Sequence, residues 1–169
     1  MNPAIREATA ADLPAINAIY NHYVATSTAT YDESPVTLAE REAWWVEHQR
    51  PFEVLVLDHA GLVAGWASMS SFRSRCAYRY TCEDSIYLRP EIHGRGWGKR
   101  LLGVLLDRAA ASGAFRSCVA GVSADQTASI RLHEAAGFQR VAHLREVGFK
   151  FGRWLDVVYL QRFFDAADR

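Results

Sequence analysis

The sequence contains few of the residues that define several common protein classes. Its 169 residues include only three cysteines, Cys76, Cys82 and Cys118. An odd number of cysteines without metal-ligand spacing excludes a disulfide framework and a cysteine-based metal site, and it predicts a reducing compartment. Only two of the 19 basic residues are lysines, which we interpret as a compositional bias without functional meaning.

Net charge and long apolar runs are also missing. The 19 acidic residues balance the 19 basic ones, so no overall field favours nucleic acid or an anionic membrane. No apolar run approaches the roughly 18 residues of a membrane span, and no basic-then-apolar signal opens the chain. Since 50% of the residues are hydrophobic, we expect one soluble, cytoplasmic domain over residues 1–169, without a metal and without nucleic-acid or membrane partners.

Hydrophobic periodicity predicts an α+β fold. Alternating or continuous apolar runs predict strands, and apolar residues spaced three or four apart predict helices. The turn at residues 58–61 joins two of the strands. The resulting order, β-α-α-β-β-β-α-β-α-β-β, predicts a mixed sheet with helices on both faces. The expected strands are 4–7, 52–57, 62–69, 82–88, 116–122, 138–147 and 155–163. One expected helix begins near residue 13, and the other three span 38–49, 97–111 and 127–136.

The most informative segment is residues 86–99, where an apolar strand is followed by a glycine-rich turn and a helix. Gly94, Gly96 and Gly98 leave amides open to an anion, and the helix adds its unpaired N–H groups. A Walker loop is excluded because His93 stands where its first glycine is needed and Arg100 where Ser or Thr is needed. The dinucleotide fingerprint is excluded by the G-x-G-x-G spacing. The segment therefore predicts a pyrophosphate site, with a ligand-free αβ turn as the alternative.

A second motif lies about 30 residues downstream. Gln126, Ser129, His133 and Gly137 recur at i, i+3, i+7 and i+11 and share one helix face. Gly137 is placed to end this helix in the left-handed conformation, and Phe138 opens the next strand.

Both motifs resemble those of the GNAT acetyltransferase superfamily. The first is similar to its acetyl-CoA loop, Gln/Arg-x-x-Gly-x-Gly/Ala, with His93 in the first place. The second is similar to its Asn-x-x-Ala/Ser-x-x-x-Tyr/His-x-x-x-Gly-Phe/Tyr helix, with Gln126 in place of Asn. The resemblance implies the GNAT acyl-CoA N-acyltransferase fold and acetyl-CoA as co-substrate. It assigns acetyl-CoA binding to Ile86, Tyr87, Leu88, His93, Gly94, Arg95, Gly96, Trp97, Gly98, Gln126, Ser129 and His133.

A narrower resemblance covers almost the whole chain. Residues 19–23, 77–83 and 148–156 look like the phosphinothricin and methionine sulfoximine N-acetyltransferases, and the run 151–156, Phe-Gly-Arg-Trp-Leu-Asp, is especially close to the sulfoximine branch. This resemblance implies direct acetyl transfer, in a ternary complex, to the α-amine of a small amino-acid analogue that bears tetrahedral phosphorus or sulfur. For phosphinothricin, it also implies herbicide resistance.

Acetylation requires a proton acceptor, because an amino-acid amine is largely protonated at neutral pH. Glu83 is the best candidate, since its apolar and aromatic neighbours should raise its pKa, and it matches the family's catalytic glutamate. Asp84 is the rival, because successive strand residues face opposite sides. His133 matches the family's catalytic histidine, as base, relay or proton donor to the thiolate, with a structural role as the alternative. An acetyl-cysteine at Cys82 is disfavoured because no activating base adjoins it.

Substrate recognition is expected from the irregular segment before Glu83. Arg73, Arg75 or Arg79 is placed to clamp a carboxylate, with a solvated loop as the alternative. The arginines argue against the rival substrate class of polyamines. Other rivals are a protein N-terminus as acceptor and a non-catalytic acyl-CoA-binding domain. Aromatic side chains expected to wall the pocket are Tyr31, Phe72, Tyr78, Phe149 and Trp154.

Residues 148–156 also predict a homodimer. We expect this segment to connect two edge strands and to expose Phe149, Phe151 and Trp154, and exposed aromatic loops often mark interfaces. Related acetyltransferases bury this region against a second subunit.

Overall fold

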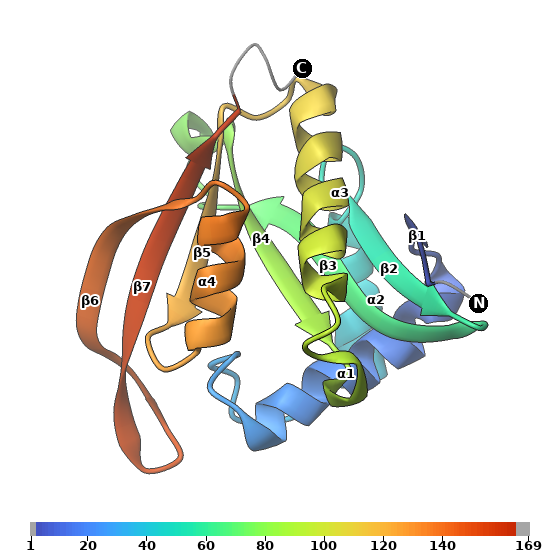
Figure 1. Cartoon of the computed structure of the whole chain (residues 1–169), viewed down its shortest axis with the longest axis horizontal. Helices are drawn as coiled ribbons and strands as arrows, with labels where there is room; N and C mark the ends of the chain where they lie inside the picture. The colour runs from blue at the N-terminus through green and yellow to red at the C-terminus, as the bar shows by residue number, and fades with distance from the viewer. Residues whose placement is uncertain (1–2, 165–169) are drawn as a thin grey trace.

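A computed structural model describes residues 3–164 and shows a mixed sheet with helices on both faces (Figure 1). The strand order is β1-β2-β3-β4-β5-β7-β6, and all neighbours are antiparallel except β4 and β5. This confirms the predicted α+β architecture. The strands are β1 (Ala4–Glu7), β2 (Val54–His59), β3 (Leu62–Ser71), β4 (Thr81–Leu88), β5 (Ser117–Ser123), β6 (Gln139–Lys150) and β7 (Arg153–Phe163), and the helices are α1 (Leu13–Thr26), α2 (Leu38–Glu47), α3 (Trp97–Ser112) and α4 (Thr127–Ala135).

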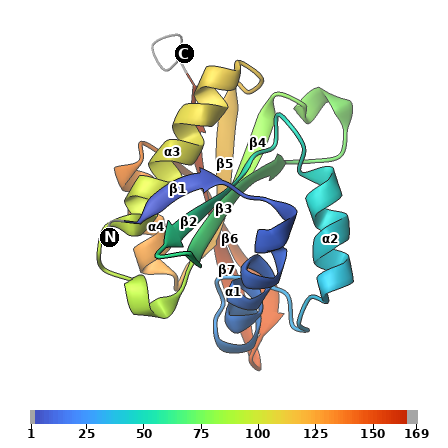
Figure 2. The ribbon, with the colours of Figure 1, turned by 90° about the vertical axis from the view of Figure 1, so that its right-hand side faces the viewer.

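The two faces of the sheet are covered by different helix pairs. Figure 2 shows α1 and α2 on one side of the strands and α3 and α4 on the other. In β2, Val54 and Val56 pack with α1, whereas Leu55 and Leu57 pack with α3. Because both faces are buried, this strand reads as a continuous apolar run and not as an alternating one.

The turn between β2 and β3 is tighter than the sequence predicted. Asp58 and His59 belong to β2, and the turn consists of Ala60 and Gly61, with φ of 55° and 82°. Two successive positive φ values are typical of a type I′ hairpin, whose twist matches that of the paired strands. The prediction of a turn over residues 58–61 was therefore too long by two residues.

The prediction for residues 148–156 was wrong in its connectivity. These residues are mostly strand: β6 runs to Lys150, β7 starts at Arg153, and Phe151 and Gly152 form the turn. Of these two strands, β6 is at the edge of the sheet and β7 is not, because β7 lies between β5 and β6. No helix among residues 3–164 is long and apolar enough to cross a bilayer.

Candidate active site

A large cavity lies where β4 and β5 separate. Their parallel pairing covers Thr81, Cys82 and Glu83 opposite residues 117–119, and then it stops. Beyond this point the two diverging strands line a cavity of about 390 Å³, which α4 and the glycine-rich turn complete. Glu83 therefore stands at the point where the strands part.

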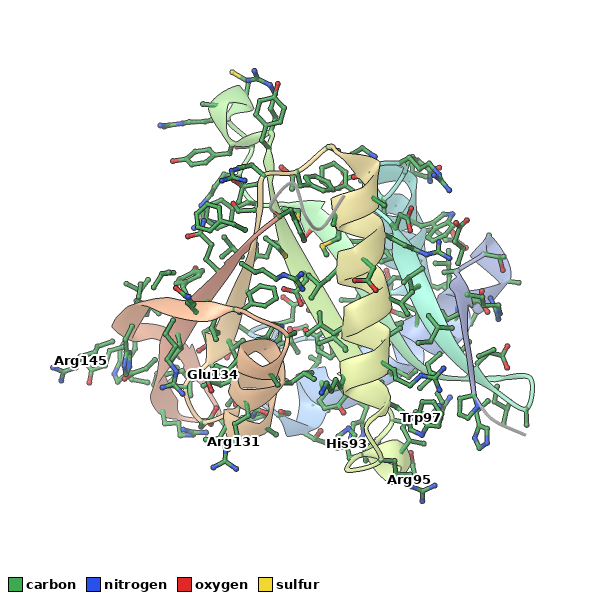
Figure 3. The ribbon with its side chains drawn as sticks, turned by 45° about the horizontal axis from the view of Figure 1, so that its top comes forward. His93, Arg95, Trp97, Arg131, Glu134 and Arg145 are labelled. Atoms are coloured by element: carbon green, nitrogen blue, oxygen red, sulfur yellow. The ribbon has the colours of Figure 1, made fainter. Side chains whose placement is uncertain are left out.

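Most residues of the two sequence motifs meet at this cavity. Arg95 and Trp97 do not line it, and Figure 3 shows Arg95 pointing outward from the start of α3. The motif residues that line it are Ile86, Tyr87, Leu88, His93, Gly94, Gly96, Gly98, Gln126, Ser129 and His133. Asp84, the rival of Glu83 in the sequence analysis, lines it as well. Lining residues that sequence reasoning missed are Tyr23, Ala29, Ser85, Lys99, Ala120, Gly121, Val122, Ser123, Ala128 and Leu132.

The glycine-rich turn has a backbone that favours glycine. Gly94 and Gly96 have φ of 73° and 78°, in the left-handed region, and Gly96 precedes the first residue of α3. Gly98 lies in the first turn, where an added Cβ would sit 3.4 Å from Leu88 and 3.5 Å from Leu132. Three of the residues at which the turn and the start of α3 line the cavity thus lack a side chain, as an anion site formed by backbone N–H groups requires.

His93 fastens the turn to the end of β4. The Tyr23 hydroxyl donates to the Leu88 carbonyl, and His93 Nε2 lies 2.9 Å from the same hydroxyl oxygen. Since that hydroxyl has already donated its proton, the His93 ring N–H is the donor to it. His93 therefore has a structural contact as well as a place in the cavity wall.

His133 and Asp84 form a buried pair in the cavity wall. His133 is 2% exposed; its Nε2 lies 2.9 Å from Asp84 Oδ2 and its Nδ1 lies 2.7 Å from the Ser129 carbonyl oxygen. Burial alone would lower the pKa of His133, but the charge and hydrogen bond of Asp84 outweigh it and raise that pKa. With both nitrogens facing oxygen acceptors, the ring is held as a cation that donates twice.

Glu83 lies on the opposite face of β4 from Asp84 and has a different environment. It is half-buried, and its Oε1 lies 3.4 Å from where a Cβ of Gly121 would be. Burial raises the pKa of Glu83, the neighbouring Asp84 charge adds to this, and Arg73 opposes it. Glu83 does not itself line the cavity, but it lies beside Gly121, which does. A partly buried carboxyl group with a raised pKa is suited to exchanging protons near neutral pH.

The predicted substrate-binding segment lies outside the cavity. Arg73, Arg75, Tyr78 and Arg79 are exposed and do not line it. The guanidinium groups of Arg73 and Arg79 lie over the rings of Phe72 and Tyr80, at 4.6 and 4.4 Å. The other aromatic candidates, Tyr31, Phe72, Phe149 and Trp154, do not line it either.

The irregular segment between α1 and α2 is fixed beside the cavity by polar contacts from distant elements. Lys150, which is 2% exposed, donates to the Ser27 and Thr30 carbonyls at 2.8 and 2.7 Å. Gln126 donates to the Thr28 hydroxyl at 2.8 Å. Gln126, which replaces the usual Asn of the motif, thus has a tertiary contact that its longer side chain permits.

Cysteine and metal chemistry have no support among the described residues. Cys82 is fully buried and does not line the large cavity. Burial raises the pKa of the Cys118 thiol well above its usual range, which keeps it protonated. Residues 3–164 contain no group of three or more His, Cys, Asp or Glu side chains placed to hold a metal ion.

Comparison with known proteins identifies the family. Residues 16–138 match the model of the Acetyltransferase (GNAT) family. The chain belongs to the GNAT family. It is therefore an acetyltransferase that uses acetyl-CoA as co-substrate.

Individual GNAT proteins are similar over almost the full chain. An L-methionine sulfoximine/L-methionine sulfone acetyltransferase of Pseudomonas paraeruginosa is 43% identical over 163 residues, which cover 95% of this chain and 94% of that protein. A Salmonella typhimurium structure with its cofactor acetyl-CoA has a TM-score of 0.94 and 41% identity, covering 98% of this chain and 95% of its own. A phosphinothricin acetyltransferase of Sinorhizobium meliloti in complex with acetyl-CoA has a TM-score of 0.91 and 41% identity, covering 96% and 89%.

Proposed function

We propose that this GNAT enzyme transfers the acetyl group of acetyl-CoA to the α-amine of a small amino acid that carries tetrahedral sulfur or phosphorus. The observation that carries the proposal is Glu83, a half-buried carboxyl group with a raised pKa where β4 and β5 part. The substrate class is supported by relatives that are named for methionine sulfoximine, methionine sulfone or phosphinothricin. Acetylation of phosphinothricin would confer resistance to that herbicide, and three free cysteines fit a cytoplasmic enzyme.

The glycine-rich turn is proposed to hold the pyrophosphate of acetyl-CoA. Gly94, Gly96 and Gly98 of the turn and the start of α3 line the cavity, and residues 86–88 continue the wall toward Glu83. Ser129 and Gln126 are assigned to the pantetheine arm from the α4 side. This arrangement would present the thioester beside Glu83. The acceptor amine would approach the thioester from the side opposite the acetyl-CoA cavity.

The reaction is proposed to proceed by direct attack in a ternary complex. Glu83 takes a proton from the substrate ammonium, and the free amine attacks the thioester carbonyl carbon. The tetrahedral intermediate then collapses and the C–S bond breaks. The departing thiolate takes up the proton that the attacking nitrogen loses, which gives the N-acetyl amino acid and CoA. Because His133 already donates from both nitrogens, we assign it to the donor side of the reaction and not to the base.

The segment before Glu83 is proposed to meet the substrate carboxylate at the rim. Arg73 is the best placed of the three predicted arginines, because its charge acts on Glu83. Arg75, Arg79 and Tyr78 then complete the rim.

A thiol-release assay tests the proposed function. The purified protein is supplied with acetyl-CoA and, separately, with L-methionine sulfone, L-methionine sulfoximine, phosphinothricin, spermidine or a short peptide. We expect release of CoA with the three amino acids and little with spermidine or the peptide. Equal or faster release with spermidine or the peptide would transfer the assignment to another amine, and acetyl-CoA binding without release would indicate a non-catalytic domain.

We further propose that the enzyme is a homodimer that pairs through the β6–β7 hairpin. β6 is an edge strand that is exposed along most of its length. Phe149, Phe151 and Trp154 are 52%, 54% and 61% exposed on the same hairpin. An exposed edge with large apolar side chains is usually covered in proteins that remain in solution.

A further inference from the structure

A second cavity lies on the other face of the sheet, under α1 and α2. Its volume is about 220 Å³, and Tyr20, Arg41, Trp44, Trp66 and Tyr87 form its aromatic and cationic part. Ser85 and Tyr87 line this cavity and the large one alike. The two cavities therefore adjoin across β4, next to Glu83.

Arg41 is a buried cation that no carboxylate contacts among the described residues, and the charge of Asp32 acts on it across the same cavity. It is 4% exposed, and its guanidinium carbon lies 4.8, 4.7 and 5.5 Å from the ring centres of Tyr20, Trp44 and Trp66. Its Nε donates to Asn17 Oδ1 at 3.3 Å, and its two terminal NH₂ groups make no hydrogen bond to a described residue. A buried cation of this kind is costly unless a polar partner reaches it.

Two further polar atoms of the same cavity have no partner. These atoms are the indole Nε1 of Trp66 and Nε2 of His48, which are buried without a hydrogen bond among the described residues. Trp66 is 2% exposed and His48 is 9% exposed. The Asp32 carboxylate also lines the cavity, but it accepts from the Tyr20 hydroxyl at 2.7 Å and not from Arg41. Arg41 and Trp66 thus present N–H donors that await an acceptor.

The position of these donors indicates which part of a substrate they contact. Ser70 is the register partner of Glu83, and Trp66 is the partner of Tyr87, four residues further along. Four residues of strand span about 13 Å. If Glu83 serves the α-amine, the carboxylate on the same carbon stays near Glu83. Only a group at the far end of the side chain can extend toward Arg41 and Trp66.

We propose that this cavity binds the acceptor side chain and that Arg41 and Trp66 donate hydrogen bonds to the oxygens of its tetrahedral sulfur or phosphorus head group. The inference rests on the proposed function. The aromatic rings enclose the methylene stem, and the oxygens satisfy the unpartnered donors. Arg41 and Trp66 would then determine specificity for an oxidised head group over an apolar side chain of similar length.

The test compares two amino acids, L-methionine sulfone and L-norleucine, which differ in the head group. The ratio of their kcat/KM values is measured for the wild type, Arg41→Met and Arg50→Met. Hydrogen bonds to a charged group contribute enough that the ratio is expected to fall about 10- to 100-fold in Arg41→Met. Arg50→Met removes a 78% exposed arginine and is expected to leave the ratio unchanged.

A second measurement does not depend on the variant enzyme folding. The indole N–H signal of Trp66 is assigned in the NMR spectrum by its loss in Trp66→Phe, and the wild type is titrated with each amino acid in the presence of CoA. The proposal requires the signal to shift with the sulfone and not with norleucine. An unchanged ratio in folded Arg41→Met, or an indole signal unaffected by the sulfone, would overturn it. Failure of the wild type to acetylate the sulfone at all would instead overturn the proposed function.

Discussion

Glu83 and Asp84 are adjacent carboxylates that β4 separates into two environments. Asp84 is 8% exposed and pairs with His133, whereas Glu83 is half-buried without an ion pair among the described residues. Their environments differ because successive side chains of a strand point to opposite faces of the sheet. Burial raises the pKa of Glu83, so this carboxyl group exchanges its proton nearer to neutral pH than an exposed one does.

Replacing Glu83 tests the base assignment. Glu83→Gln keeps the size but cannot accept a proton, so kcat/KM is expected to fall about 10²- to 10⁴-fold. Because burial raises the pKa of Glu83, the wild-type rate should decline on acidification at a pH above the ordinary carboxyl range, and the variant should lack this limb. Acetyl-CoA affinity, measured by titration calorimetry, should be nearly unchanged. A variant within twofold of the wild type over pH 6–9 would move the base role elsewhere.

Sequence reasoning identified some of these residues but not how they pair. The alternation along residues 82–88 was sufficient to place Asp84 on the face of Ile86 and Leu88, and helical spacing placed His133 beside Ser129. Their contact depends on how β4, β5 and α4 stack, and two residues 49 positions apart in the chain carry no local sign of it. Arg41 was missed for the same reason, since its cavity is built from four separate elements.

At the scale of elements, turn chemistry determined which predictions were accurate. Gly96 precedes the first residue of α3, and Gly137 follows the end of α4. Both adopt the left-handed conformation that glycine favours at helix ends, so both features were predictable. The β6–β7 turn was not, because its first residue is Phe151, which adopts a positive φ of 51°. A phenylalanine in that conformation is uncommon, so sequence preferences place the turn elsewhere.

The glycine-rich turn gives a prediction at this scale. Gly96 has φ of 78° with open space around it, so Gly96→Val would strain the backbone and put a branched side chain among the amides. Acetyl-CoA affinity is expected to fall at least tenfold in a folded protein, as measured by titration calorimetry and circular dichroism. Gly103→Ala is the control, because its added Cβ meets nothing within 4 Å in the interior of α3. Full affinity in folded Gly96→Val would contradict the assignment.

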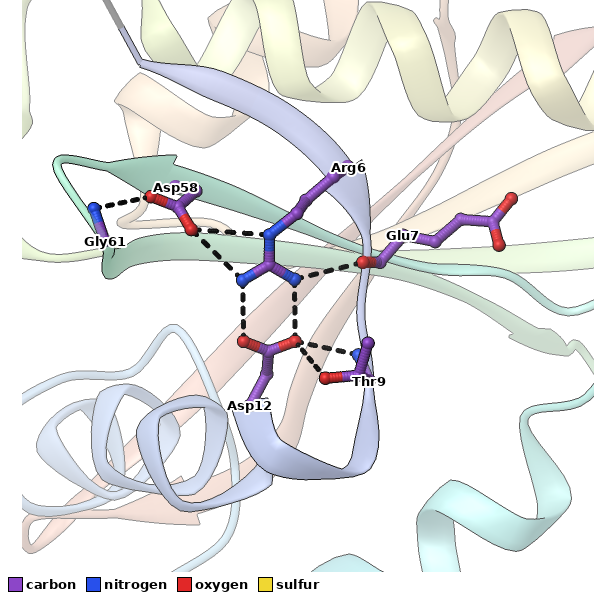
Figure 4. Close-up of polar contacts among 6 residues, drawn as sticks. All are labelled: Arg6, Glu7, Thr9, Asp12, Asp58 and Gly61. Atoms are coloured by element: carbon purple, nitrogen blue, oxygen red, sulfur yellow. Dashed lines mark hydrogen bonds and ion pairs between the residues drawn. The ribbon is translucent and has the colours of Figure 1, made fainter. Parts of the chain in front are cut away.

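At the scale of the whole molecule, an ion-pair network ties the chain's first elements to the sheet (Figure 4). Arg6 in β1 donates to Asp12 at 2.8 and 2.9 Å and to Asp58 in β2 at 3.3 and 3.1 Å. Asp12 also accepts from the backbone N–H and the hydroxyl of Thr9. The hydrogen bond from Arg6 chiefly lowers the pKa of Asp12, to about 2.

This network predicts a pH-dependent stability. A carboxyl group whose folded pKa is depressed stabilises the fold above its unfolded value and loses that contribution as pH falls through about 2. Asp12→Asn should therefore lower the free energy of unfolding at pH 7 by about 1–2 kcal/mol. In denaturant melts the difference from the wild type should shrink steadily below about pH 4. A difference that stays constant from pH 7 to pH 3 would exclude this origin.

The proposed dimer is the prediction that concerns the molecule as an assembly. The hairpin pairs Phe149 with Trp154 edge to face, with ring centres 5.1 Å apart, and leaves more than half of each side chain exposed. Covering this surface with a second copy would remove both the apolar patch and the free edge of β6 from water. Light scattering at micromolar concentration should give twice the 18.9 kDa of one chain, and Trp154→Asp should give a single chain. Leu62→Asp is the matched control, because Leu62 is 71% exposed on the β2–β3 hairpin, far from β6 in the strand order. Since a charged residue at Leu62 leaves the proposed interface intact, that variant should remain dimeric, and a wild-type mass of 18.9 kDa would contradict the proposal.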